Sequence, residues 1–322
     1  MRSTTVGKNL AQRLPVIKVR PNTSIVIDLL RRIDKNLGIL ANMVEGKVEA
    51  RGDFLGKLAV TGTLRRPEFE GRANLDDGRF ISRDYGRFEN LNLDARLNRI
   101  TRAEATESPV LQASSSGFLT RLAIVTAEGT LGGQPFFANG TAEFAGLAPT
   151  LLDLFFVGES LPVRLPGLFS GTVDVDLEMN GEVKSEDGQP YLQPQLSGIV
   201  VIPNGTFDIP VGGSSPATAE ALSESGPQVS VDLSLDISLG KEFFVQAYDA
   251  RVRALGDLNL RTEQGAARLF GRVELNRGLI NIPLYDAAFR LRSGLAIFDG
   301  PFIPVLRGVE AVVDLAGYRI TA

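Results

Sequence analysis

The sequence contains no histidine, no cysteine and no tryptophan. Without histidine it lacks the side chain that most often serves as a general base near neutral pH and as a ligand for transition metals. Without cysteine it has no disulfide, no thiolate zinc site, no iron–sulfur cluster and no thiol nucleophile. An enzyme would have to work with serine, lysine, tyrosine and carboxylates alone. We therefore expect a protein that is not an enzyme and holds no cofactor and no metal.

Long hydrophobic runs are also missing. The longest strictly apolar stretches are a few residues long, as at residues 154–157, whereas a membrane-spanning helix needs about 20. The first eight residues carry basic side chains, but no apolar segment follows them, so we expect no signal peptide. With 322 residues, 43% of them hydrophobic, the chain has enough apolar side chains to bury a large core.

Charge is distributed unevenly along the chain. Residues 1–102 contain 20 basic and 12 acidic residues, residues 122–250 contain 3 and 17, and residues 251–322 contain 10 and 7. A basic end of this kind fits an anionic lipid surface or an acidic partner. Ordinary solvated strand faces also explain the charge distribution, and we favour this second explanation. No basic run is interleaved with aromatic residues, so we expect no nucleic-acid partner.

A period of two dominates the hydrophobic pattern. Apolar and polar residues alternate over residues 91–97, 173–180 and 229–239, which is typical of a strand with one apolar and one solvated face. Continuous apolar strands of the buried parallel type are missing, which argues against an α/β fold. We predict an all-β protein with antiparallel neighbours and, at about 12–15 residues per strand and turn, about 20–25 strands.

Helical signals are sparse. Apolar residues follow a helical spacing near residues 24–42, where polar residues 22–24 are candidate caps, so we predict a helix there. Residues 151–157 form either a short helix or a buried strand, and periodicity does not distinguish the two. Residues 212–226 are rich in serine, alanine, glycine and glutamate, which predicts a loop with at most one helical turn.

A short motif occurs three times, at residues 67–80, 194–207 and 267–280. Each copy has an apolar residue, a glycine two positions later, alternating apolar residues, and a second glycine before a final apolar residue. The first glycines, Gly71, Gly198 and Gly271, would weaken a strand unless the sheet bends there. The second glycines, Gly78, Gly205 and Gly278, suit turns with positive φ, and Asn204-Gly205 is a hairpin signal.

Stacked repeats of this kind predict a long antiparallel sheet that curls along its length. The carboxylates that alternate with the apolar residues, as at Asp174, Asp176, Asp232 and Asp236, belong on its solvated side. Nothing in the pattern supplies a second layer over the apolar face. The sheet therefore either folds over itself to form an ordinary sandwich core, or leaves the face open for a ligand.

The order of these motifs resembles the TamB family of the AsmA-like bridge-type lipid-transfer proteins. The similarity rests on the segment Leu196–Pro210, the alternating strand 229–239, the third repeat around Gly271–Gly278, and the glycine-spaced segment Phe289–Gly300. It covers residues 170–322 closely and residues 44–100 weakly. The chain differs from typical members in its shorter length and in the absence of an N-terminal membrane anchor, so we interpret it as a fragment or partial gene product.

The resemblance implies a β-taco, a long curled antiparallel sheet with an open hydrophobic groove and one or two short helices. On this basis residues 1–43 form an N-terminal segment with a helix, and residues 44–322 form a continuous β-taco repeat domain with a possible break near residues 146–170. The expected groove-lining residues are Leu91, Leu93, Leu97, Val173, Val175, Leu177, Met179, Val200, Ile202, Val229, Val231, Leu233, Leu235, Ile237, Leu239, Val273, Leu275, Phe289 and Leu291.

The implied function is a non-enzymatic conduit that carries phospholipids between membranes of the bacterial envelope and contributes to outer-membrane biogenesis. The implied location is the periplasm, with an inner-membrane anchor in the full-length parent and membrane contact through parts that are missing here. The implied partners are phospholipid acyl chains and an outer-membrane barrel protein of the Omp85 type. Two alternatives stay open: a scaffold for outer-membrane protein assembly by strand augmentation, and a purely structural β-repeat adhesin.

Overall fold

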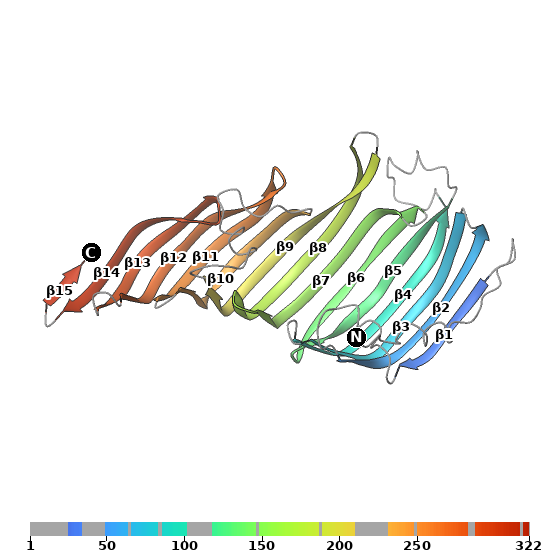
Figure 1. Cartoon of the computed structure of the whole chain (residues 1–322), viewed down its shortest axis with the longest axis horizontal. Coiled ribbons are helices and arrows are strands. Elements are labelled where there is room, and N and C mark those ends of the chain that lie inside the picture. The colour runs from blue at the N-terminus through green and yellow to red at the C-terminus, as the bar shows by residue number, and fades with distance from the viewer. Residues whose placement is uncertain are drawn as a thin grey trace, which may run out of the picture.

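The described residues of the computed structural model form one sheet of 15 strands that follow one another in chain order (Figure 1). The described ranges are 25–33, 49–63, 66–82, 86–101, 118–145, 148–186, 189–209, 231–247, 250–282, 287–315 and 318–321. The strands are β1 Ile25–Ile33, β2 Glu49–Thr63, β3 Arg66–Ser82, β4 Gly86–Thr101, β5 Phe118–Leu131, β6 Gln134–Ala145, β7 Ala148–Leu165, β8 Phe169–Glu186, β9 Gln189–Asp208, β10 Asp232–Ala247, β11 Ala250–Glu263, β12 Ala266–Ile282, β13 Ala287–Gly300, β14 Val305–Leu315 and β15 Tyr318–Thr321.

The all-β, curled-sheet prediction is confirmed, but the strands are fewer and longer than expected. Strands β7 and β8 each contain 18 residues and β9 contains 20. The estimate of 20–25 strands assumed about 12–15 residues for each strand and turn, whereas these three strands alone are longer than that. Residues 151–157, which the sequence left open between helix and strand, lie within β7 and pair with both β6 and β8.

The predicted helix near residues 24–42 is wrong over Ile25–Ile33. This segment is β1, which pairs antiparallel with β2 from Ile25 opposite Val60 to Ile33 opposite Gly52. Pairing with β2 along one side of all nine residues is a tertiary interaction that overrides a local helical spacing. The rest of that prediction, the boundary at residue 43 and the loop 212–226 lie outside the described residues, and no helix occurs in the part of the chain that is described.

Glycines inside strands mark where the sheet bends, as the repeats predict. Gly198 and Gly271 adopt φ of 135° and 131°, a region that is open almost only to glycine. A Cβ atom at either position would overlap a backbone carbonyl oxygen of the neighbouring strand, that of Asp176 and that of Asp257 respectively. The backbones therefore approach each other more closely than any other residue would permit.

The second glycine of each repeat has a different role from the one predicted. Gly78, Gly205 and Gly278 lie inside β3, β9 and β12 and are not turn residues. In two repeats the positive φ belongs to the preceding residue, 50° at Asp77 and 51° at Arg277. A Cβ at Gly78 would lie 2.7 Å from Leu75 Cδ2, so here glycine makes room for a neighbouring side chain.

The expectation that all neighbouring strands are antiparallel fails at one place. Strands β9 and β10 are parallel, in register from Gln195 opposite Asp232 to Asp208 opposite Gln246. In a parallel pair, the connection must bring the chain back to the end of the sheet at which the first strand begins. This takes a dozen or more residues. Residues 210–230, which lie outside the described residues, provide that length, and the sequence pattern gave no sign of the chain direction after them.

The sheet has a single layer. Among the described strands, extensive contacts join only strands that are adjacent in the sheet, with small additional contacts between β7 and β9 and between β3 and β5. No described element packs across either face as a second sheet or a helical layer would. The described residues also include no helix that could cross a membrane.

Candidate functional site

One face of the sheet carries an unbroken row of apolar residues. Strand register places these residues side by side, each opposite the next, across eleven strands from β2 to β12. We call the face that carries this row the inner face. The row consists of Phe54, Leu75, Leu93, Ala127, Ala138, Phe156, Leu177, Gly198, Leu235, Leu260 and Leu269.

A second row runs beside the first on the same face. It passes from β5 to β13 and is again made only of apolar residues and glycine. Because side chains alternate between the two faces of a strand, residues two positions apart in a regular strand share a face, so the two rows are neighbours. The second row consists of Gly129, Phe136, Gly158, Val175, Val200, Ile237, Leu258, Gly271 and Phe298.

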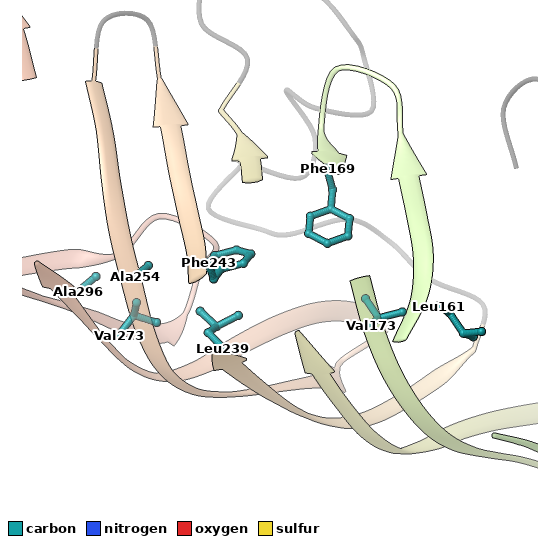
Figure 2. Close-up of a cluster of buried hydrophobic side chains, with 8 residues drawn as sticks. All are labelled: Leu161, Phe169, Val173, Leu239, Phe243, Ala254, Val273 and Ala296. Carbon is teal, nitrogen blue, oxygen red and sulfur yellow. The ribbon is translucent and has the colours of Figure 1, made fainter. Parts of the chain in front are cut away.

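The most buried part of the inner face lies where the strands bend. Figure 2 shows eight buried side chains gathered on one side of the sheet, with Phe169 and Phe243 on the upturned parts of their strands. Phe243 is 6% exposed and Val273 is 4% exposed, although no second layer covers them. Curvature of the sheet brings these side chains together. The cluster is Leu161, Phe169, Val173, Leu239, Phe243, Ala254, Val273 and Ala296.

A series of phenylalanines extends the apolar face toward the N-terminal strands. The rings of Phe80, Phe88, Phe136 and Phe156 follow one another with centroid separations of 5.8, 6.1 and 5.8 Å. Gly129 makes room for this series, because a Cβ there would lie 3.2 Å from the Phe136 ring. The sequence prediction missed these rings. The apolar stretch at residues 154–157 was the available signal, but periodicity did not distinguish a helix from a strand there.

The structure brings most of the predicted groove residues onto the inner face. Three of them, Leu93, Leu177 and Leu235, belong to the first row. Met179 and Leu233 lie two positions from Leu177 and Leu235 on the same strands and therefore share their face. Leu97 lies opposite Gly71, and Leu91 lies opposite Gly78. Eight further predicted residues belong to the buried cluster, pack against it or lie in the second row. They are Val173, Val175, Val200, Ile202, Ile237, Leu239, Val273 and Leu275.

The remaining four predicted residues are not assigned to the inner face by these criteria. Phe289 and Leu291 pair with Ile280 and Gly278 near one end of β13, and Leu291 is 5% exposed. Val231 lies just before β10, so strand register does not assign its face, and Val229 lies outside the described residues. Whether any of these 19 residues contacts a lipid stays a prediction.

The opposite, outer face is polar over β8 to β11. Ser238 Oγ donates to Asp257 Oδ1 at 2.6 Å, and Asn259 Nδ2 donates to Asp236 Oδ1 at 2.8 Å. Asp174 Oδ1 accepts a hydrogen bond from the backbone N–H of Ser160 at 2.6 Å. These groups satisfy one another across neighbouring strands, as expected for a solvated face. They do not form a general acid–base pair.

Arginine–carboxylate pairs occupy the outer face of β3 and β4. Asp94 Oδ2 accepts from Arg72 at 3.1 Å and from Arg96 at 3.2 Å. The hydrogen bond from Arg96 lowers the pKa of the Asp94 carboxyl, and the charge of Arg72 acts in the same direction. Asp94 is therefore a fully ionised structural anion at neutral pH, not a proton carrier.

A polar recess of about 510 Å³ lies farther along the sheet. Its lining includes Glu143, which is 1% exposed and accepts a hydrogen bond from Arg121 Nη2 at 2.6 Å. The guanidinium neutralises this carboxylate, and Asp232, which also lines the recess, accepts a hydrogen bond from Gln193 Nε2 at 2.5 Å. Among the described residues there is also no group of acidic side chains placed to hold a metal ion.

The apolar inner face is therefore the feature with functional potential. Large uncovered apolar surfaces are rare on soluble monomers and mark sites for lipids, membranes or other proteins. This face combines an apolar floor several strands wide with a polar reverse side, so it can hold an elongated apolar ligand while the protein stays hydrated.

Comparison with known proteins gives one match. Residues 126–320 match the family model of the TamB C-terminal domain. The matched range begins within β5 and ends within β15, so it includes the buried cluster, the parallel pair and most of both apolar rows. No curated protein and no solved structure matches the chain.

Proposed function

The chain belongs to the TamB family, and from this membership we propose that its inner face is a conduit for phospholipids between the membranes of the bacterial envelope. The family acts in assembly of the envelope and outer membrane as a transport and assembly module, without enzymatic activity. Transport of lipid in particular is our proposal. The observation that carries it is the pair of apolar rows on a face that no described element covers.

The energetics of such a conduit follow from its uniformity. Each buried CH₂ group of an acyl chain contributes about 0.8 kcal/mol, so a phospholipid gains several kcal/mol wherever its chains lie on the rows. Because neighbouring strands present similar residues at a spacing of about 4.8 Å, a chain that leaves one strand regains similar contacts on the next. Movement along the sheet then meets no deep trap.

The test is the lipid content of the purified protein. We expect phospholipid to co-purify from envelope extracts in roughly stoichiometric amounts and to be released by organic extraction, because the apolar rows would otherwise be exposed to water. Native mass spectrometry counts the bound molecules, and circular dichroism confirms that the sheet is folded. A folded protein that carries no phospholipid and takes none up from vesicles would contradict the proposal.

One observation favours a second function, the assembly of outer-membrane proteins by strand augmentation. Strand β15 pairs only with Val312–Leu315 of β14, so residues 305–311 have no described partner on that side. Val305, Leu306 and Val309 in this segment are 58%, 57% and 42% exposed. An exposed strand edge with apolar side chains can accept a strand from another protein. Photo-crosslinking from this segment to precursors of barrel proteins, including the Omp85-type partner, would support this function.

A further inference from the structure

Two exposed triplets of residues on the outer face are opposite in charge and alike in layout. In the first triplet, Ile199 on β9 lies opposite Asp176 on β8 and Asp236 on β10, and Ile199 is 52% exposed. We call these three residues the acidic triplet. Each of them is one position from a residue of the first apolar row, so strand alternation places the acidic triplet on the outer face.

The second triplet has the same layout with basic residues. Leu279 on β12 lies opposite Arg251 on β11 and Arg290 on β13, and Leu279 is 43% exposed. We call these three residues the basic triplet. Arg251 is adjacent to Val252, which lies two positions from Ala254 of the buried cluster. Strand alternation therefore places the basic triplet on the outer face as well.

The surroundings of each triplet have the same sign of charge as the triplet. Residues 174–178, 195–201 and 232–238 contain five acidic and no basic residues. Residues 250–253, 276–282 and 287–292 contain five basic and no acidic residues. The turns beside the basic triplet, residues 248–249 and 283–286, contain one aspartate each and lie outside the described residues, so this region is net basic.

The charges of the triplets are not neutralised by neighbours on the same sheet. None of the four charged residues forms an ion pair with another described residue. Asp236 accepts a hydrogen bond from Asn259, and the guanidinium of Arg251 lies 4.3 Å from the centroid of the Phe244 ring. These contacts hold the two side chains in place and leave their charges uncompensated.

The two triplets are too far apart to pair with each other within one chain. Asp236 lies opposite Asn259, and Arg251 is eight residues away along β11, which is roughly 26 Å at the rise of a strand. Salt screens exposed charges beyond a Debye length of about 8–10 Å at physiological ionic strength. Direct pairing of the triplets therefore requires two copies of the chain.

We propose that the outer face binds a second copy of this chain, with the acidic triplet of one copy against the basic triplet of the next. Each triplet lies on three adjacent strands about 4.8 Å apart, so two carboxylates can meet two guanidinium groups while Ile199 packs against Leu279. The charged pairs give specificity, and the apolar contact excludes water between them. The inner faces stay uncovered, so this contact goes beyond the proposed conduit and does not rest on it.

The contact is heterologous, because the two triplets differ. A bound pair of copies leaves one triplet of each sign free, so further copies can add until a ring closes or the row continues. Exposed ion pairs are individually weak and are screened by salt. We therefore expect reversible association that depends strongly on ionic strength.

The test exchanges the charges of the two triplets in separate variants of the full chain. Asp176→Arg/Asp236→Arg makes both triplets basic, and Arg251→Asp/Arg290→Asp makes both acidic. Neither variant can then pair acidic with basic triplets by itself, whereas a mixture of the two restores opposite charges at every contact.

A third variant controls for the change in net charge. Glu70→Arg/Glu128→Arg changes two exposed carboxylates on the outer face of β3 and β5, outside both triplets. Sedimentation velocity measures the mass of each protein at low and high salt, and circular dichroism establishes that each variant is folded.

We expect the wild type and the control variant to associate at about 50 mM salt and to dissociate at about 500 mM. Each charge-exchange variant alone should associate at least about tenfold more weakly than the wild type. An equimolar mixture of the two charge-exchange variants should associate again at low salt.

A wild type that stays monomeric at low salt overturns the inference. Association that neither salt nor the charge exchange weakens also overturns it, because it would indicate contact between apolar inner faces. A mixture of the two variants that does not associate, although the wild type does, excludes pairing of the triplets. None of these results bears on the conduit, which the phospholipid content of the protein tests separately.

Discussion

On the inner face, some positions of the register rows are glycines that lie between large apolar side chains. Gly198 lies between Leu177 and Leu235, and Gly271 lies between Leu258 and Phe298. Side chains converge on the concave side of a bent sheet, so large residues on every strand would collide. Glycine at these positions relieves the crowding and also permits the backbone geometry of the bend.

Gly198→Ala should destabilise the sheet by about 2–4 kcal/mol. The added Cβ would overlap the carbonyl oxygen of Asp176, and φ of 135° strains any residue with a Cβ. Gly294→Ala is the matched control, because the nearest atom to its Cβ, Val309 Cγ2, is 3.5 Å away. Chemical denaturation of both variants measures the difference, and equal stability would show that the bend does not depend on Gly198.

Leu235→Arg should cost only about 1–3 kcal/mol of stability but strongly reduce the bound phospholipid. Because no described layer covers the inner face, the guanidinium can extend to water, while its charge interrupts the apolar row between Gly198 and Leu260. Ser234→Arg, on the exposed outer side of the same strand, should change neither quantity. Unfolding by Leu235→Arg alone would instead indicate a closed core, where an unpaired charge is far more costly.

At the scale of the strands, the sequence indicated which side chains share a face. It did not indicate whether neighbouring strands run parallel or antiparallel. The period of two correctly indicated β8 and β10 and assigned their apolar residues to one face. Strand alternation is the same for parallel and antiparallel pairs, so it did not reveal that β9 and β10 are parallel. For β1, a chance helical spacing was misleading, because pairing with β2 decides the structure of that segment.

Engineered disulfides can test the parallel pair, since the chain has no cysteine of its own. Ser197→Cys/Ser234→Cys should form a disulfide, because these residues lie opposite each other on the outer face. Thr206→Cys/Ser234→Cys should not, because Thr206 aligns with Phe244, roughly 33 Å along the strand from Ser234. Mass spectrometry of the two variants after oxidation decides between the registers, and the reverse result would indicate an antiparallel pair.

At the scale of the molecule, the curled sheet and its apolar face were anticipated from sequence, but the width of that face was not. The sequence indicated which residues alternate, and 15 of the 19 expected groove residues can be placed on the inner face by register or by packing against the cluster, with Leu291 and Phe289 beside them. It did not indicate the phenylalanine series or the contribution of Phe169 and Phe243. These contacts depend on how far the strands bend and on the offset between distant segments.

The central claim is that lipid occupies the inner face and not the outer face. The most direct measurement places a photoreactive benzophenone amino acid at each position from 233 to 238 of β10, one at a time, and detects phospholipid adducts after illumination in the envelope. Strand alternation predicts adducts at Leu233, Leu235 and Ile237 and none at Ser234, Asp236 and Ser238. Equal phospholipid labelling at all six positions, or crosslinks to other proteins without any phospholipid adduct, would contradict the account.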